Sequence, residues 1–208
     1  MTTWIAIVIS VAWLLVGEAA MASPAVGPRE AVEAAVERAL SILRDGKVDG
    51  ILVADRSEEI KRIVREMFDF DEISRRALSR YWQALTPEEQ GEFVTLFRDL
   101  LERSYVTQIE ASGGERITFV GESIGGDSAT VRSKVVTRQG TEIPLDYRLH
   151  LRDGRWRIHD VVVRGISLVS SYRAQFDRVI RAESYNALRD RLLKNTLDTA
   201  AARRSPES

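Results

Sequence analysis

The sequence predicts an α+β fold, with helices first, then a four-stranded antiparallel meander, and then C-terminal helices packed on one face of the sheet. Three observations lead to this prediction. Up to about residue 111, apolar residues recur every three or four positions, which is the period of an amphipathic helix. Between residues 116 and 163 they alternate with polar residues, as in half-buried strands. After residue 167 the helical period returns.

Residues 1–22 have the features of an export signal. An uncharged apolar run from Trp4 to Val16 is followed by small residues, and Ala-Met-Ala at 20–22 fits the rule for cleavage before Ser23. The run is shorter than the roughly 20 apolar residues that span a bilayer. No Lys or Arg precedes the run, so an uncleaved N-terminal anchor is the alternative to a signal peptide.

The composition is typical of one globular domain, with 44% hydrophobic and 29% charged residues. The 30 basic and 31 acidic residues nearly cancel, so no long-range field would attract nucleic acid, and none is expected as a partner. The absence of Cys excludes disulfides, thiolate metal sites and a lipid-anchored lipoprotein. We expect a single domain over 23–198 and a disordered tail over 199–208.

Two helices are predicted at the start of this domain. Pro28 opens the first, in which apolar residues recur at helical spacing as far as Leu43. Asp-Gly pairs at 45–46 and 49–50 then indicate a loop. Asp55, with a glutamate three positions later, forms a capping box that opens the second helix.

Two further helices precede the strands. Asp69 opens the third in the same way, and its pattern continues to about Trp82. Thr86-Pro87 gives the clearest helix start in the chain, because a cap residue, a proline and Glu89 stand at the preferred positions. This fourth helix continues to about Ala111. It has a wide apolar stripe, typical of a core-facing helix, formed by Phe93, Leu96, Phe97, Leu100, Leu101, Tyr105 and Ile109.

Four strands are predicted, over 116–122, 129–137, 142–151 and 155–163. Asp153-Gly154 indicates a two-residue hairpin between the last two. The third strand alternates most clearly, and one of its faces is polar. We therefore expect one face of the sheet to be solvated and the other to be covered by helices.

Two helices close the domain, over about 167–181 and 184–197, and Ser167 is the expected N-cap of the first. The first of them has an apolar stripe whose simplest interpretation is packing onto the sheet. Tyr172 and Arg173 are amphipathic side chains, and we consider them candidates for the rim of a pocket.

Few residues suggest catalysis. The only histidines, His150 and His159, fall on the polar faces of adjacent predicted strands. The sequence contains no HExxH motif, no G-x-S-x-G elbow and no glycine loop of the phosphate-binding kind. No catalytic residue, metal or cofactor is therefore expected.

Asp160 is the one carboxylate whose position in the sequence suggests a catalytic role. On strict alternation it shares the inner face of the fourth strand with Trp156 and Ile158, where an unpaired charge is costly. In one interpretation Asp160 is the general base of an isomerase-like enzyme with a conical apolar pocket.

The second interpretation of Asp160, which we favour, is structural. A bulge at His159-Asp160 would change the alternation and would bring Val161 and Val163 to the inner face. The carboxylate could also pair with an arginine such as Arg164 or Arg173.

Several stretches, in their order and spacing, resemble the MlaC-type phospholipid-binding proteins, also called toluene-tolerance auxiliary components of ABC transport systems. The resemblance covers about residues 30–195. One departure is Ser104-Tyr105, where the family usually has Thr-Tyr. The stretches are FDFD (68–71), ISRRALSRYW (73–82), LTPEEQGEFVTLFRDLLERSYV (85–106), WRIHDVVVRGISLVSSYRAQF (156–176) and LRDRL (188–192).

The resemblance implies a periplasmic carrier that holds the acyl chains of a phospholipid in an apolar cavity. Such a carrier exchanges lipid between an outer-membrane lipoprotein–porin complex and the substrate-binding subunit of an inner-membrane ABC transporter. Related members have been linked to hopanoid-type lipids, so the lipid species is open. Two acyl chains of about 30 methylenes resist transfer to water by more than about 20 kcal/mol, which an apolar lining removes.

Two sets of residues are candidates for this lining. The sheet set consists of Phe119, Tyr147, Leu149, Trp156, Ile158, Val161 and Val163. The helix set consists of Phe93, Phe97, Leu100, Tyr105, Tyr172 and Phe176, with Arg173 beside Tyr172 at the rim.

Overall fold

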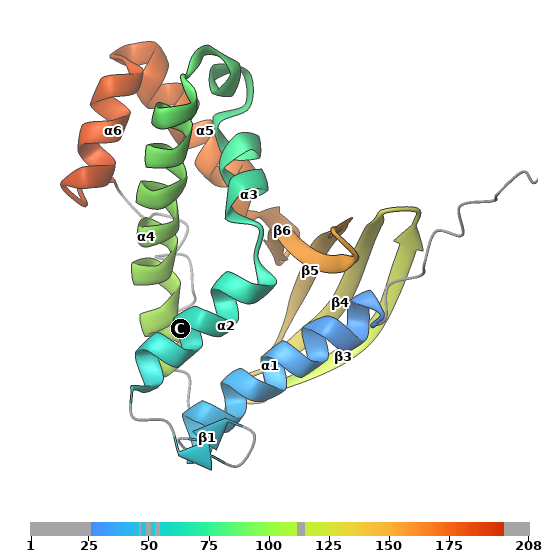
Figure 1. Cartoon of the computed structure of the whole chain (residues 1–208). Helices are drawn as coiled ribbons and strands as arrows, with labels where there is room; N and C mark the ends of the chain where they lie inside the picture. Colours follow the sequence, from blue (N-terminus) through green and yellow to red (C-terminus); the bar gives the residue numbers. More distant parts are fainter. Residues whose placement is uncertain (1–25, 46, 49–50, 53–54, 112–114, 198–208) are drawn as a thin grey trace, which may run out of the picture.

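The computed structural model describes residues 26–45, 47–48, 51–52, 55–111 and 115–197. Within this part of the chain, helices precede and follow an antiparallel sheet (Figure 1), which confirms the predicted α+β fold class. The predicted signal segment 1–22 and tail 199–208 lie outside the described residues.

The helices begin where the sequence predicts. They are α1 (Pro28–Asp45), α2 (Arg56–Met67), α3 (Phe70–Leu78), α4 (Pro87–Ala111), α5 (Leu168–Ala182) and α6 (Tyr185–Leu193). Asp55, Asp69 and Ser167 each accept a hydrogen bond from the backbone N–H three residues later, which confirms these caps. Thr86 and Glu89 satisfy each other's backbone N–H groups in a complete capping box.

Two segments differ from the sequence prediction. The third helix ends at Leu78 and not near Trp82, because Ser79 has a positive φ of 51° and starts the 3-10 helix η1 (Ser79–Ala84). In the predicted loop after α1, the short strands β1 (Lys47–Val48) and β2 (Ile51–Leu52) pair with each other.

The main sheet has the strand order β3-β4-β5-β6-β7, and all of its neighbours are antiparallel. Its strands are β3 (Arg116–Gly125), β4 (Ser128–Val136), β5 (Glu142–Arg152), β6 (Arg155–Val163) and β7 (Ile166–Ser167). The fifth strand was not predicted. It consists of two residues that follow a tight turn at Arg164-Gly165, where both φ angles are positive.

The predicted bulge in β6 is confirmed. Arg148 pairs with Asp160 while the next residue, Leu149, pairs with Ile158, so that His159 has no partner on β5. Because paired residues point to the same side, Ile158 and Val161 lie on one face of the sheet and Asp160 on the other. We call the face of Ile158 the inner face.

Among the described residues, buried side chains form three clusters. The sheet cluster lies between α1 and the inner face and consists of Val32, Ala129, Val131, Tyr147, Leu149, Trp156 and Ile158. The helical cluster connects α3, α4, α5 and α6, which stand beside the sheet in Figure 1. A third cluster connects α1, α2 and α4 through Ile42, Ile60, Ile63 and Val106.

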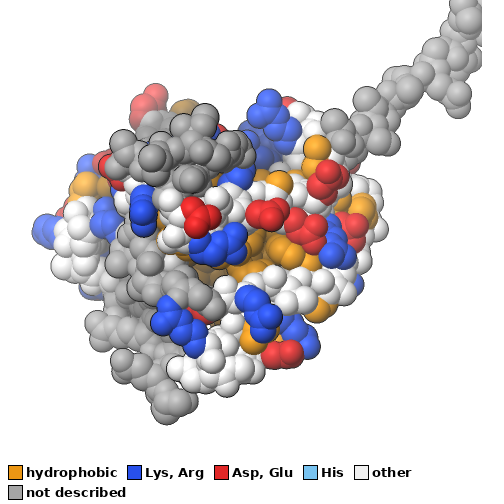
Figure 2. Space-filling view, turned by 90° about the horizontal axis from the view of Figure 1, so that it is seen from below, with side chains coloured by type: hydrophobic (Ala, Val, Ile, Leu, Met, Phe, Trp, Pro, Cys, Tyr) orange, Lys and Arg blue, Asp and Glu red, His pale blue; other side chains and the backbone are white. Residues whose placement is uncertain are grey.

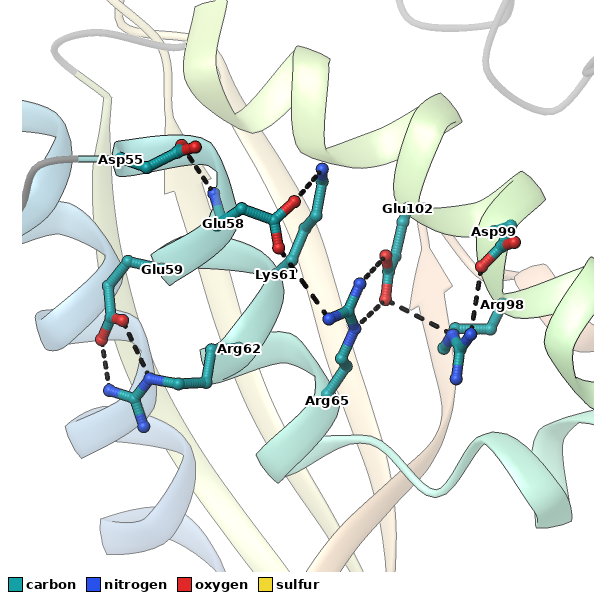
Figure 3. Close-up of polar contacts among 9 residues, drawn as sticks. All are labelled: Asp55, Glu58, Glu59, Lys61, Arg62, Arg65, Arg98, Asp99 and Glu102. Atoms are coloured by element: carbon teal, nitrogen blue, oxygen red, sulfur yellow. Dashed lines mark hydrogen bonds and ion pairs between the residues drawn. The ribbon is translucent and has the colours of Figure 1, made fainter.

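The C-terminal end of α2 is connected to three neighbours, and we call residues 65–69 the α2 junction. Arg65 donates two hydrogen bonds of 2.7 Å to the buried carboxylate of Glu102 on α4 (Figure 3). Glu66 pairs with Arg38 of α1 at 3.2 Å. The N–H of Asp69 donates to the carbonyl oxygen of Ile158 on β6. The junction therefore fixes α2 to two helices and to the sheet.

Replacing Glu102 with Gln is expected to lower the free energy of unfolding by about 1–2 kcal/mol, because a charge-assisted bidentate pair becomes a neutral contact. The control is Glu142→Gln, since Glu142 pairs with Lys134 on an exposed surface of the sheet and should contribute less than about 0.5 kcal/mol. Urea unfolding of both variants measures the difference. Equal effects would contradict a special role for Glu102.

Candidate functional site

The inner face of the sheet is covered at one end and open at the other. The first turns of α1 pack on it through Val32 and Val36. Further along α1, Ile42 and Leu43 belong to the cluster with α2 and α4. The first half of α1 therefore packs on the sheet, and its second half packs on α2 and α4.

The part of the inner face beyond α1 is apolar, its side chains are half-buried or exposed, and we call it the open end. Its rows follow from the register, in which Ile117 pairs with Val135 and Val135 with Ile143, while Leu145 pairs with Val163. Ile117, Val135 and Ile143 are half-buried and belong to none of the three clusters. The open end consists of Ile117, Phe119, Val135, Ile143, Leu145, Val161 and Val163.

Figure 2 shows the molecule from below, where its surface is hollowed. The floor of the hollow is apolar, and Lys, Arg, Asp and Glu side chains surround it. An apolar floor with a charged rim suits a ligand that has an apolar body and a polar end.

The polar atoms next to the open end are satisfied or uncharged. Ser133 lies between Phe119 and Leu145 in the register, and its hydroxyl donates to the carbonyl oxygen of Leu145 at 2.7 Å. The rings of Phe119 and Tyr147 stack across it, with centroids 6.5 Å apart. Burial raises the pKa of the Tyr147 hydroxyl to about 12, so this group is neutral at pH 7. No charge from these residues interrupts the apolar wall.

The structure places the predicted sheet set on one face. Tyr147, Leu149, Trp156 and Ile158 are buried in the sheet cluster, largely beneath α1. Phe119 and Val161 are half-buried and Val163 is 41% exposed, so these three lie at the open end.

The helix set lies elsewhere. Phe93, Phe97, Leu100, Tyr172 and Phe176 are buried together in the helical cluster, and Tyr105 lies at its border. Their rings contact one another, for example Phe97 and Tyr172 at 5.0 Å between centroids. The structure thus does not bring the two sets together in one lining. Tyr172 is only 2% exposed and is not a rim residue, whereas Arg173 is exposed and lines a separate pocket.

Sequence reasoning missed apolar residues of the open end. Ile117 and Val135 could have been found, since alternation in the first two strands puts them on the face of Phe119. The clusters against which the half-buried Val36, Met67 and Ile109 pack could not be predicted, because their stripes resemble ordinary core stripes.

Asp160 is part of the framework. It is 5% exposed and lies on the face opposite the open end. Its carboxylate accepts hydrogen bonds from Arg148 Nη1 at 3.0 Å, from the Ser167 hydroxyl at 2.7 Å and from the Val169 N–H at 3.1 Å. The expected ion pair exists, but its partner is Arg148 and not Arg164 or Arg173.

These contacts oppose the interpretation of Asp160 as a general base. Both carboxylate oxygens already accept hydrogen bonds, and two of the donors belong to the start of α5. A negative charge at this end of a helix is also favoured by the helix dipole. Asp160 therefore attaches α5 to β6.

The two histidines meet beside the α2 junction, with ring centroids 5.5 Å apart. His150 Nε2 lies 2.9 Å from Asp69 Oδ2, to which Arg152 also donates. Burial alone would raise the pKa of Asp69, but the Glu72 N–H, Arg152 and His150 hold it below its usual value. Burial, with the nearby charges of Arg76 and His150, lowers the pKa of His159 to about 4.

The lowered pKa of His159 predicts a loss of stability in mild acid. The unfolded chain binds a proton near pH 6.5 that the folded chain binds only near pH 4, so stability falls as the pH falls between these values. We expect a loss of about 2 kcal/mol between pH 7.5 and pH 5. Urea unfolding at both pH values measures it, and His159→Gln should remove most of the difference. A wild-type chain equally stable at both would contradict the prediction. The contribution of Asp69 is lost only below pH 3.8, in a separate range.

Within the described ranges, no group of three or more His, Asp or Glu side chains is placed to hold a metal ion. None of the helices in the same ranges combines the length and the apolar character needed to cross a membrane.

Comparisons with known proteins agree with one another. The family model described as MlaC protein matches residues 33–194. The toluene tolerance protein ttg2D of Pseudomonas putida is 28% identical over 121 residues, which are 57% of this chain and 56% of that protein. The match thus spans about half the length of this curated relative.

Among solved structures, the phospholipid-binding protein from Ralstonia solanacearum, in complex with a phospholipid, has a TM-score of 0.68 at 23% identity. The match covers 85% of this chain and 99% of that chain. At this level of identity the likeness shows a shared fold.

Proposed function

Because the chain belongs to the MlaC family, we propose that it is a periplasmic carrier that binds phospholipid through its acyl chains and has no catalytic activity. The observations that carry the proposal are the open end, an apolar part of the sheet face with half-buried or exposed side chains, and a hollow with an apolar floor and a charged rim (Figure 2). The phospholipid in the Ralstonia solanacearum protein of the same fold supports this choice of ligand.

The energetics favour a carrier of this form. Each methylene that moves from an apolar surrounding into water costs about 0.8 kcal/mol, so a lipid leaves a bilayer readily only for an equally apolar surface. The open end and the half-buried Val36, Met67 and Ile109 supply such a surface from the sheet and from three helices.

The proposal includes the two partners with which lipid is exchanged. The chain would exchange lipid with an outer-membrane lipoprotein–porin complex and with the substrate-binding subunit of an inner-membrane ABC transporter. Transfer between surfaces of similar polarity is nearly neutral in free energy, so the energy for net transport would come from the transporter. The relation to a toluene tolerance protein supports this assignment.

Lipid analysis of the exported protein tests the proposal. The full chain is produced with residues 1–22 in a Gram-negative host, purified from the periplasmic fraction without detergent, and examined by native mass spectrometry. We expect a mass increase of one phospholipid per chain and an N-terminus at Ser23. Protein that is repeatedly empty and also takes up no lipid from vesicles would overturn the proposal.

A further inference from the structure

A second cavity is lined by residues that do not belong to the open end. It has a volume of about 270 Å³ and lies between α5 and the segment where α3 passes into η1. None of its lining residues belongs to the inner face of the sheet. Its chemistry differs from that of the hollow, because three arginines line it.

The charges in this pocket do not balance. Among the described residues that line it, Arg80, Arg173 and Arg181 are basic and only Asp177 is acidic. Both carboxylate oxygens of Asp177 already have partners. Arg80 and the Tyr81 hydroxyl both donate to its Oδ1, and Arg181 Nε lies 3.2 Å from its Oδ2. The lining has a net charge of two positive units.

Arg173 is the lining arginine that has no acidic partner among the described residues. Among the described residues it has no hydrogen-bond or ion-pair partner, and it is exposed on the first half of α5. Arg173, Asp177 and Arg181 are spaced four residues apart, so they lie in a row on one side of the helix. An anion held by Arg173 would therefore also come within reach of the other guanidinium groups.

The backbone opposite Arg173 is strained. Ser79 has φ 51° and ψ −119°, a combination that glycine adopts more easily than any other residue. This turn directs the chain so that Arg80 and Tyr81 face α5, with the Arg80 guanidinium 4.9 Å from the centre of the Tyr81 ring. Strain of this kind in a pocket lining is typical of ligand sites.

We propose that this pocket is a binding site for a phosphate group, held by Arg173 together with Arg80 and Arg181. Two unbalanced positive charges match the charge of a phosphate monoester, and guanidinium groups bind phosphate oxygens in pairs. The hydroxyls of Ser79 and Ser170 in the lining add donors of the kind that bind phosphate. The volume leaves room for the group to which the phosphate is attached. The phosphate could belong to a soluble molecule or to a lipid head group on a membrane surface.

A titration with inorganic phosphate at constant ionic strength tests the site in the full chain. Backbone amide resonances of residues 79–81 and 170–181 are expected to shift and to saturate in wild type. Arg173→Ala should weaken binding by about tenfold or more, which is the effect of losing a charge-assisted hydrogen bond. The matched control is Arg178→Ala, since Arg178 is exposed on the same helix and outside the pocket lining.

Two further measurements complete the experiment. Asp177→Asn removes the competing carboxylate and should tighten phosphate binding several-fold. Flotation with phosphatidylcholine vesicles, with and without phosphatidic acid, separates the two sources of phosphate. Vesicle binding that needs both phosphatidic acid and Arg173 assigns a lipid head group, and phosphate binding without vesicle binding assigns a soluble ligand. Absence of saturable binding in both assays, or equal weakening by Arg173→Ala and Arg178→Ala, would overturn the proposal.

Discussion

Asp160→Ala is expected to lower the free energy of unfolding by about 3–4 kcal/mol. The substitution leaves the Val169 N–H and the Ser167 hydroxyl at the start of α5 without their acceptor, and it leaves Arg148 without its partner. Each unsatisfied buried donor costs about 1–3 kcal/mol. Arg148 is half exposed and can regain water, which keeps the total at the lower part of the range known for buried ion pairs.

Equilibrium urea unfolding measures this loss, with Asp146→Ala as the control. Asp146 lies two residues from Arg148 on the same face of β5, is half-buried, and has no ion pair among the described residues. Its removal should cost less than about 0.5 kcal/mol. If Asp160→Ala folded as stably as wild type but lost an activity, the enzyme interpretation of Asp160 would return.

Leu145→Glu is expected to reduce lipid affinity by at least about 100-fold while the chain stays folded. Leu145 is half-buried at the open end, on the inner face at the border of the sheet cluster. A glutamate there keeps its hydration as long as the hollow is empty. An acyl chain that entered would remove this hydration, at a cost of several kcal/mol.

Two measurements on the same protein test the predicted loss of lipid affinity. Native mass spectrometry gives the fraction of chains that carry lipid after purification, and uptake of a fluorescent phospholipid from vesicles gives relative affinity. Thr118→Glu is the control, because Thr118 is exposed on β3 and adjacent in sequence to Phe119, but points to the opposite face. Retention of lipid by Leu145→Glu, or an equal loss in Thr118→Glu, would contradict a lipid site at the open end.

Much of this fold could be predicted because its signals are local. The caps at Asp55, Asp69, Thr86 and Ser167 act within one turn of helix, so the sequence indicates where helices begin. The bulge in β6 was predictable too, since an acidic residue on an apolar face conflicts with the cost of burying charge.

The division of the helices between sheet and bundle could not be predicted. A helical stripe shows which side of a helix is buried, but not which element covers it. Phe93, Phe97 and Phe176 therefore looked like a wall facing the sheet, whereas they pack against one another in the helical cluster. Helix α1 covers part of the inner face, on β3 and β4, and its shorter side chains gave a weaker signal.

The α2 junction affects how the helices can move when a ligand enters the hollow. Residues 65–69 contact α4 through Arg65, α1 through Glu66 and β6 through Asp69. These contacts hold two helices and the sheet together near one point. Such a point acts as a pivot, and displacement grows with distance from it. A small rotation there would leave the fastened contacts intact while the remote ends of the helices move apart by much more. We therefore expect the helix ends remote from the junction to move most when a ligand enters the hollow.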